Sequence, residues 1–399
     1  MHSGQFRLSE PTARTGLPNA VWALGLVSLF MDVSSEMIHS LLPVFMVSVL
    51  GASAVTIGAI EGIAEATASM AKVFSGALSD RMGKRKPLAL LGYGMAALTK
   101  PMFPLAGSAS AILLARFVDR IGKGIRGAPR DALIADLTPA AVRGAAFGLR
   151  QTLDTVGAFV GPGLALLLMV LFAGDFRAVF WVAVVPALLA VALLALFVRE
   201  PPRAGAASPP LALGLRGAWA LGRDYQRVLW VGGLFTLARF SEAFLVLRGQ
   251  SLGLADAYAP LILVALNLAF SLTAYPAGRL SDRVARVRIL RVALVVLVLA
   301  DAVLAWAPNL PTLFAGIALW GLHLGLSQGL LSAMIADVAP AEHRGAAFGW
   351  FHLLTGVLLL VASTLAGVLW SQAGPAATFI AGAVFAAAAT LSLHRPGVR

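Results

Sequence analysis

The sequence predicts an all-α membrane protein in which twelve transmembrane helices form two pseudo-symmetric six-helix bundles. Its 399 residues are 59% hydrophobic and only 13% charged, with a mean hydropathy of +0.85. A soluble protein carries about a quarter charged residues, so most of this surface is expected to face lipid. A membrane-spanning helix needs about twenty apolar residues, which leaves room for about twelve spans joined by short connectors.

The chain is also a tandem repeat of two halves. The segment from Gly76 to Arg81 returns 202 residues later as Gly278 to Arg283, with Gly, Leu, Ser, Asp and Arg at the same spacing. Ala132 to Asp136 returns as Ala333 to Asp337 at an offset of 201 residues. Nearly the same offset relates two distant segments, and internal repeats of this kind are typical of transporter folds.

The expected spans are the long apolar runs between polar connectors. The longest connector is rich in Pro, Gly and Ala and falls where the repeat divides, so we expect it to be a cytoplasmic linker. The expected domains are a cytoplasmic N-terminal tail (1–18), a first bundle (19–199), the linker (200–225), a second bundle (226–394) and a cytoplasmic C-terminal tail (395–399). The expected spans are 19–49, 54–80, 87–106, 109–137, 143–171, 177–199, 226–249, 255–281, 289–307, 310–337, 344–371 and 375–394.

The distribution of charge predicts how the chain is oriented in the membrane. Lys and Arg gather in the connectors on one side, whereas connectors 51–54, 105–110, 308–311 and 371–375 carry no charge. By the positive-inside rule the basic side is cytoplasmic, which places both termini in the cytoplasm and the multi-pass chain in the cytoplasmic (inner) membrane. The net charge of +12 therefore reflects topology, and no nucleic-acid partner is expected.

The repeated segment resembles the signature of a known family. Gly76-x-x-x-Asp80-Arg81, followed by the basic cluster Lys84 to Lys86, is similar to the loop between the second and third spans of the major facilitator superfamily. Within that family the resemblance is to the prokaryotic drug- and metabolite-exporter-like branches. It implies a conformational latch at the cytoplasmic helix ends, made by Gly76, Asp80, Arg81, Asp136, Gly278, Asp282, Arg283 and Asp337.

Two further segments resemble motifs of the same family. Gly157 to Gly163 is similar to a glycine–proline motif of its antiporters, although the final glycine pair is replaced by Leu and Ala. Small residues also allow close helix contact, so a packing role is the alternative. Arg116 matches the basic residue of a recurring motif in the fourth span, which implies either a role in proton movement or a structural one.

The spans carry more charge than contact with lipid allows. A charge in mid-span is costly, so each one should face a cavity or a partner. Asp32, Glu36 and His39 follow at i, i+4 and i+7 and share one helix face, which indicates an aqueous cavity between the halves. The candidate proton-coupling residues are Asp32, Glu36, Glu61, Glu65, Asp154 and Glu242. The candidate substrate-binding residues are His39, Arg116, Arg120, Lys123, Arg126, Arg150, Gln151, Arg239, Asn267 and His352.

The repeat is an internal control for these charges. At an offset of 201 residues, the position of Arg116 holds Ile317 in the second half. The position of Lys123 holds Leu324. Two halves of similar fold have similar folding requirements, so we infer that the charges of the first half serve transport. One acid does return, because Ser35-Glu36 is echoed by Ser241-Glu242, and facing glutamates would suit a site at the repeat interface.

Other polar residues in the spans have local explanations. Lys72 and Lys100 are expected to snorkel or to pair locally. His323 and His352 are expected at helix contacts or in the pore wall, and not as metal ligands. Asp301 lies near the end of a span and is expected to be solvated.

These features predict a secondary active transporter that alternates between inward-open and outward-open states. We expect it to export a small organic solute in exchange for protons. The cavity bases favour an anionic or zwitterionic solute, or an amphipathic one if the bases neutralise the neighbouring acids. The alternatives are a proton-coupled uptake symporter and a divalent-metal exporter that uses Asp32, Glu36 and His39.

Other classes of function are not expected. Nucleotide-binding, zinc-helix and nucleophile-elbow motifs are absent from the sequence, which argues against a membrane enzyme and against an ATP-driven pump. The sequence contains no Cys, which excludes disulfides and thiolate metal sites. No cofactor is expected, and the partners are a small-molecule substrate, protons and the lipid bilayer. The chain is expected to act as a monomer.

Overall fold

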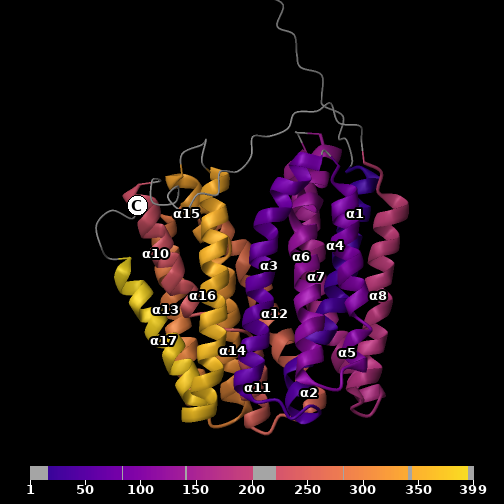
Figure 1. The fold of residues 1–399 in the computed structure, drawn as a ribbon. Helices are drawn as coiled ribbons and strands as arrows, with labels where there is room; N and C mark the ends of the chain where they lie inside the picture. The colour runs from indigo at the N-terminus through magenta and orange to yellow at the C-terminus, as the bar shows by residue number, and fades with distance from the viewer. Residues whose placement is uncertain are drawn as a thin grey trace, which may run out of the picture.

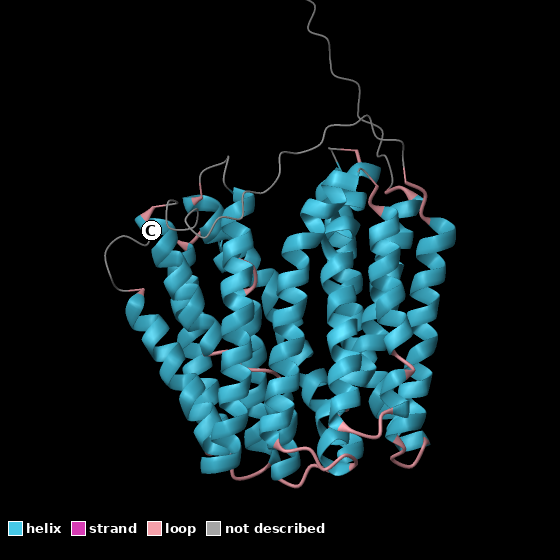
Figure 2. Cartoon of the chain, in the orientation of Figure 1, coloured by secondary structure: helices cyan, strands magenta, loops and turns pink. Residues whose placement is uncertain are grey.

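The computed structural model describes residues 17–82, 84–139, 142–200, 222–281, 283–339 and 344–393, without the side chains of residues 76, 77, 79–82, 281, 336 and 344–346. All regular elements within these ranges are helices, as Figure 2 shows. Most of the expected linker and both expected tails fall outside the described residues. The predicted all-α fold is confirmed.

Each of the twelve expected spans contains one helix or a pair of consecutive helices. The first half consists of α1 (Asn19–His39), α2 (Leu42–Ser48), α3 (Ala54–Met82), α4 (Lys86–Thr99), α5 (Met102–Leu105), α6 (Ala109–Leu137), α7 (Arg143–Leu171) and α8 (Phe176–Phe197). The second half consists of α10 (Arg223–Leu237), α11 (Ala243–Ser251), η2 (Asp256–Tyr258), α12 (Pro260–Ser281), α13 (Arg286–Ala305), α14 (Leu310–Ser327), α15 (Leu330–Val338), α16 (Arg344–Ala373) and α17 (Pro375–Ser392).

Several spans are interrupted at points that the hydropathy pattern did not predict. The first span breaks between α1 and α2, where Pro43 in the first turn of α2 has no N–H to continue the helical bonding. The seventh span is non-helical from residue 238 to residue 242, between α10 and α11. The tenth span breaks at Gly329, whose φ of +71° is a left-handed conformation that favours glycine. Irregular backbone at membrane depth is tolerated where it lines a cavity.

Seven helical segments of the described chain are long and apolar enough to cross a membrane by length and composition alone. The charged helices α3 and α6 are not among them. On α6 the charged side chains of Arg116, Asp119, Arg120 and Arg126 are buried, and so is Glu61 on α3. These two helices therefore turn their charges toward the interior of the protein, as the cost of exposing charge to lipid requires.

The two halves lie side by side and meet along two helix pairs. Helices α1 to α8 form one side of the molecule and α10 to α17 the other (Figure 1). At the seam α3 packs against α16, and α7 packs against α12. Glycines permit the close approach, since a Cβ added at Gly62 would lie 2.9 Å from Leu360 Cα and one at Gly367 would lie 2.5 Å from the Ala54 carbonyl oxygen.

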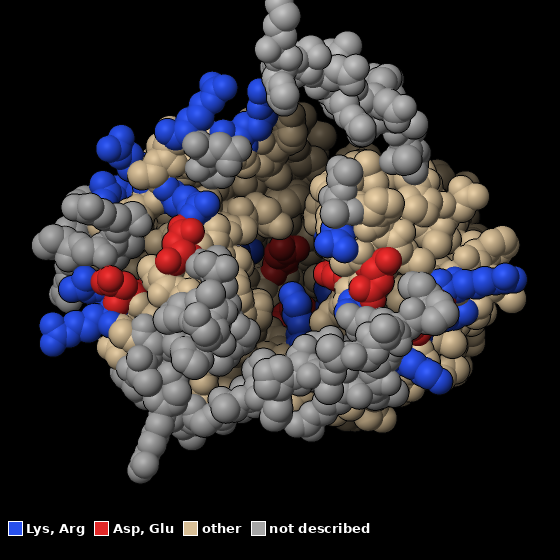
Figure 3. Space-filling view, turned by 90° about the horizontal axis from the view of Figure 1, so that it is seen from above, with Lys and Arg blue, Asp and Glu red and all other residues tan. Residues whose placement is uncertain are grey.

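The seam is closed at one end and hollow at the other. At the end that carries α2 and α11, Gln250 Nε2 donates to Ser48 Oγ at 2.9 Å across the two halves. Seen from the opposite end, the space between the halves is hollowed, and acidic and basic side chains are visible inside it (Figure 3). Lys and Arg side chains surround this opening. In the part of the chain that the structure describes, the space between the halves is therefore open at one end and bridged by contacts at the other.

Candidate functional site

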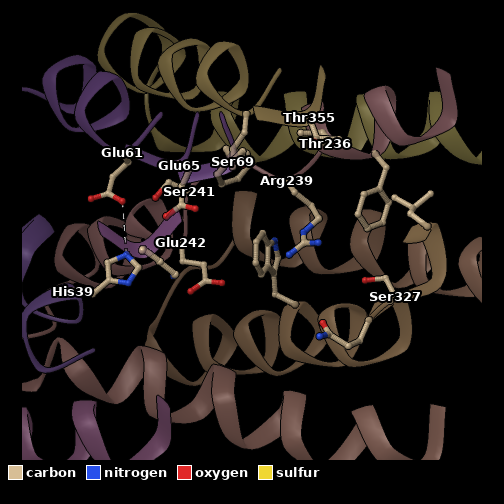
Figure 4. A pocket seen from close by; sticks show the side chains of 18 of the residues that line it. His39, Glu61, Glu65, Ser69, Thr236, Arg239, Ser241, Glu242, Ser327 and Thr355 are labelled. Atoms are coloured by element: carbon tan, nitrogen blue, oxygen red, sulfur yellow. Dashed lines mark ion pairs between the residues drawn. The ribbon is translucent and has the colours of Figure 1, made fainter. Parts of the chain in front are cut away.

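A central cavity of about 540 Å³ lies between the two halves. The first half contributes side chains from α1, α3 and α6, among them Glu36, Glu65 and Lys123. The second half contributes Arg239 and Glu242 from the non-helical segment 238–242, together with residues of α12, α14, α15 and α16 (Figure 4). This volume fits one drug-sized or smaller organic molecule.

A second cavity of about 510 Å³ continues from the first and lies mainly within the first half. The two share Glu36, Ser69, Lys123 and Ala158 in their walls. The residues that line only the second cavity are Asp32, Ala68, Lys72, Gly124, Arg126, Gly127, Arg130, Asp131, Asp154 and His352. Many charged residues of the first half thus face connected polar space and not lipid.

Most acids of the first half are neutralised by a specific base. Arg116 Nη2 bonds to Glu61 Oε2, and both side chains are nearly inaccessible. Arg120 Nη2 lies 3.3 Å from Glu65 Oε1. A carboxylate in low dielectric is stabilised by such a partner, and breaking the pair leaves an uncompensated charge. These acids are therefore bound in ion pairs in the cavity-open arrangement.

His39 lies between two carboxylates. Its Nδ1 is 3.6 Å from Glu36 Oε2. Its Nε2 is 3.7 Å from Glu61 Oε2 (Figure 4). The imidazole therefore lies between Glu36 and the almost inaccessible Glu61, and all three residues line the central cavity. Its position suits the relay of a proton between the two acids as well as contact with a solute.

In the second cavity, several charges are also paired. Arg150 Nη1 bonds to Asp154 Oδ2 at 2.7 Å, and Arg130 Nε bonds to Asp131 Oδ1 at 3.0 Å. Arg126 is stacked over the ring of Tyr93, with 4.8 Å between the guanidinium carbon and the ring centroid. These three bases are held by neighbours within the first half.

Some charged groups of the cavity walls form no ion pair with a described residue. Among the residues that the structure describes, Asp32, Lys123, Arg239 and Glu242 take part in no ion pair. Arg239 packs over the Phe235 ring, with its guanidinium carbon 5.3 Å from the ring centroid. Two bases of the second cavity, Lys72 and Arg126, are likewise in no ion pair among the described residues. Two acids and several bases are thus available to protons and to a solute.

The glycine–proline motif of α7 packs directly behind two of the acids. A Cβ added at Gly157 would lie 3.0 Å from Asp32 Cβ, and one at Gly161 would lie 2.7 Å from Glu36 Cβ. Only glycine allows α7 to approach α1 this closely. The motif therefore positions the face of α1 that carries the acids.

Three candidate binding residues do not reach either cavity wall. Arg116 is buried in its pair with Glu61. Arg150 is held by Asp154, and Gln151 is exposed and accepts a hydrogen bond from Arg150 Nη2 at 3.0 Å. By contrast, Asn267 of α12 lines the central cavity and donates to the carbonyl oxygen of Ala158 at 2.9 Å, across the seam.

The expected latch region contains an ion pair that occurs once in each half. Arg85 Nε lies 3.1 Å from Asp136 Oδ2 in the first half, and Arg286 Nη1 bonds to Asp337 Oδ2 in the second. The two pairs are related by the offset of 201 residues. Of the other expected latch residues, Gly278 belongs to α12 and Arg283 follows it. Asp282 lies outside the described residues, and only the backbone is described for Gly76, Asp80 and Arg81.

The structure also shows contacts that sequence reasoning missed. Arg85 was identified only as part of a basic cluster, and the carboxylate of Glu200 accepts hydrogen bonds from the backbone N–H groups of Arg85 and Lys86 at 2.5 and 3.1 Å. Lys100 Nζ lies 3.0 Å from Asp119 Oδ1, so it pairs locally as expected. The offset of 201 residues relates Arg85 to Arg286 and Asp136 to Asp337, and this correspondence could have indicated the Arg85 pair from the sequence.

One expectation about a buried acid was wrong. Asp301 was expected to be solvated near the end of its span, but its exposed fraction is 0%. The side chain points into the second half, where Trp320 Nε1 donates to Asp301 Oδ1 at 3.3 Å. His323 is buried at a helix contact, with Nδ1 2.7 Å from the Ala293 carbonyl oxygen. Within the described part of the chain, no three His, Asp or Glu side chains are grouped as metal ligands.

Comparison with known proteins agrees with this architecture. The family profile of the Major Facilitator Superfamily matches residues 24–247 and 228–397. The chain is 31% identical over 376 residues to an uncharacterized MFS-type transporter of Methanocaldococcus jannaschii, covering 93% of both chains. It is 26% identical to the multidrug resistance protein MdtH of Photorhabdus laumondii, over 82% of this chain and 80% of that one. The fold resembles that of the nucleoside transporter NupG, with a TM-score of 0.79 at 14% identity over 94% of this chain and 99% of that one.

Proposed function

This chain belongs to the major facilitator superfamily, and we propose that it exports a small organic solute across the cytoplasmic membrane in exchange for protons. It is a secondary transporter and not an enzyme, in keeping with the family to which it belongs. The proposal adds the direction, the coupling ion and the class of solute, which is anionic, zwitterionic or amphipathic.

The shape of the molecule supports transport by alternating access. The cavity reaches both halves, is hollow toward one face and is closed at the other by contacts between α3 and α16 and between Gln250 and Ser48. In the proposed orientation the hollow face is cytoplasmic, because the basic side of the chain surrounds it. The bundles of residues 19–199 and 226–394 then rock against one another about the central site, within a single chain.

The observation that carries the proposal is the set of cavity charges without an ion-pair partner. Asp32 and Glu242 are the acids of this set, in the part of the chain that the structure describes. A carboxylate that is not in an ion pair accepts a proton more readily than one paired with arginine. We therefore assign the proton cycle first to Asp32 and Glu242. Glu36, Glu61, Glu65 and Asp154 take part only when their partners move.

The bases of the same set suit an anionic group of the solute. Lys123 faces both cavities, and Arg239 reaches the central cavity from the second half. Neither base forms an ion pair with a described acid, so a carboxylate, sulfonate or phosphate can gain a charge-assisted hydrogen bond there. A zwitterionic solute would place its amine near Glu242.

Export is favoured over uptake by two observations. The glycine–proline motif that resembles that of antiporters packs against Asp32 and Glu36, which are among the acids proposed to carry protons. A relative of similar length is named a multidrug resistance protein. In an antiporter the solute and the proton occupy the cavity in turn, which suits a single site where bases and unpaired acids share the walls.

Everted membrane vesicles test the proposed coupling. Respiration acidifies the vesicle interior, which quenches a pH-sensitive acridine dye, and an exported solute added outside should release protons and restore fluorescence. Aromatic sulfonates, amino acids and amphipathic quaternary ammonium ions form the test panel, because none of them carries protons across a bilayer unaided. Vesicles without the protein are the background control.

The variants decide which residues carry the proton. Asp32→Asn and Glu242→Gln should each abolish the fluorescence recovery, whereas Asp224→Asn, an exposed acid on α10 that pairs with Arg227, should leave it unchanged. An uptake symporter gives no recovery in this arrangement. Solute flux that is independent of an imposed pH gradient would refute proton coupling.

A further inference from the structure

The second half buries a carboxyl group that has no basic partner. Asp301 of α13 is fully inaccessible, and its Oδ2 has no hydrogen-bond partner among the described residues. Its Oδ1 accepts one hydrogen bond, from Trp320 Nε1 of α14. An ionised carboxylate is rarely buried without a charge partner, so the group calls for a physical explanation.

The repeat shows what the first half places at the same two positions. An offset of 201 residues relates Asp301 to Lys100, and it relates Trp320 to Asp119. In the first half these positions form a buried ion pair, with 3.0 Å between Lys100 Nζ and Asp119 Oδ1. In the second half an acid has taken the position of the base, and an indole has taken the position of the acid. The contact is preserved, but its neutralising charge is lost.

No base replaces the lost charge in the described surroundings of Asp301. Trp320 of α14 donates a hydrogen bond to it, and Gly382 of α17 faces it, since a Cβ added at Gly382 would lie 2.6 Å from Asp301 Oδ2 and 2.9 Å from Cε1 of Phe240 in segment 238–242. His323 of α14 packs against the Trp320 ring with 6.3 Å between ring centroids, and its Nδ1 bonds to a carbonyl oxygen.

Arg239 precedes Phe240 in segment 238–242, and among the described residues it packs over the Phe235 ring and forms no ion pair with Asp301. Other charged groups lie toward the two ends of α13. At the nearer end of α13, the guanidinium of Arg248 on α11 binds the carbonyl oxygens of Leu304, Ala305 and Ala307. At the farther end Asp337 of α15 pairs with Arg286, and Arg279 belongs to the last turn of α12. A neutral carboxylic acid avoids the cost of a buried charge in this environment.

Asp301 lies one layer of aromatic side chains behind the central cavity. Phe240 and Trp320 both line that cavity, and both also contact Asp301 or its immediate surroundings. The Trp320 side chain is almost fully buried, with an exposed fraction of 1%. Water therefore reaches Asp301 only if one of these rings moves.

We propose that Asp301 is a proton-binding site of the second half, which exchanges its proton with cavity water when the Trp320 ring is displaced. On release, the proton passes to water in the cavity and leaves a carboxylate behind; on return, the ring closes over the neutral acid. The inference rests on the proposed proton coupling and adds a second, gated proton site to it.

Infrared spectroscopy of the purified protein in lipid tests whether Asp301 holds a proton. The carbonyl stretch of a protonated carboxylic acid is resolved from that of a carboxylate and shifts in deuterium oxide. At neutral pH the wild-type protein should show such a band, and Asp301→Asn should remove it. Asp224→Asn, at the exposed end of α10, should retain it. If Asp301→Asn leaves all carboxylic acid bands in place, Asp301 is ionised and the proposal is overturned.

The rate of the deuterium shift tests the gate. Trp320→Ala should accelerate the shift about tenfold or more, which corresponds to removing about 1.4 kcal/mol of opening free energy. Trp320→Phe keeps a ring but loses the N–H, so it should change the position of the band while the exchange stays slow. Equal exchange rates in the wild-type protein and Trp320→Ala would refute the gate.

The proposed proton-coupled export and the proposed proton site at Asp301 can be refuted independently. The infrared measurement needs neither a solute nor a proton gradient, so it reports on Asp301 even if no compound produces a fluorescence recovery in vesicles. If recovery occurs with wild-type protein, Asp301→Asn should reduce it at least severalfold. Full recovery with Asp301→Asn would overturn a role for Asp301 in transport and would leave Asp32 and Glu242 as the proton carriers.

Discussion

The buried pair of Lys100 and Asp119 allows a quantitative test of how the first half is stabilised. Lys100 Nζ lies 3.0 Å from both Asp119 Oδ1 and Ser35 Oγ, and the two charged side chains are only 2% and 7% exposed. Replacing Lys100 by Met keeps most of the volume but leaves the carboxylate of Asp119 without its base. Breaking a buried pair on one side costs about 3–5 kcal/mol. We therefore expect Lys100→Met to lower the free energy of unfolding by about that amount.

Removing both charges should have a much smaller effect. The double variant Lys100→Met with Asp119→Leu removes both charges of this pair, and apolar replacement of a buried pair is often neutral or stabilising. We expect its free energy of unfolding to lie within about 1 kcal/mol of the wild-type value.

Equilibrium unfolding in mixed dodecylmaltoside and dodecylsulfate micelles measures these free energies. The matched control is Arg227→Met, which breaks the exposed pair between Arg227 and Asp224 at the surface and should cost at most about 1 kcal/mol. If Lys100→Met costs no more than this control, or if the double variant is as unstable as the single one, the ion pair is not what stabilises this contact.

Three other predictions address the cavity, the latch and the seam. Arg239→Gln should weaken the binding of an anionic solute about tenfold to a hundredfold, whereas Arg239→Lys should retain part of the affinity. Isothermal titration measures both affinities. Equal affinity in the wild-type protein and the two variants would exclude Arg239 as the anion site. Arg286→Ala should weaken the latch pair and increase the labelling of a cysteine introduced at Val246, which is buried on α11 at the closed end, in a chain with no Cys of its own. Arg286→Asp combined with Asp337→Arg should restore the wild-type rate, and failure to do so argues against the pair. Gly367→Leu should also open the closed end, because its Cβ would lie 2.5 Å from the Ala54 carbonyl oxygen, and unchanged labelling at Val246 would show that the seam adapts.

The helices of this protein could be predicted because hydropathy is a property of each segment by itself. Every expected span contains a helix, since about twenty apolar residues in lipid must satisfy their backbone hydrogen bonds internally. The repeat and its motif could also be recognised, because recognising them requires only the order of the residues. The face shared by Asp32, Glu36 and His39 followed from the helical period, and all three line the polar space between or within the halves.

The partners of the charges could not be predicted in the same way. Glu61 and Arg116 are 55 residues apart in sequence, and their contact depends on the rotation and depth of α3 relative to α6. The same holds for His39, whose two carboxylate neighbours come from α1 and α3. The break that brings Arg239 and Glu242 into the cavity wall interrupts a run that hydropathy treats as one span.

Composition, helical period and residue order were enough to predict the class of fold, the number of spans and the half of the chain in which charge is concentrated. The three-dimensional arrangement was needed to see which acids are neutralised, which remain available at the cavity, and that Asp301 is enclosed behind Trp320. The difference arises because the energy of a charge in a membrane protein is set by its neighbours in space. Those neighbours come from other helices, and the sequence of one segment does not determine how the helices are aligned against one another.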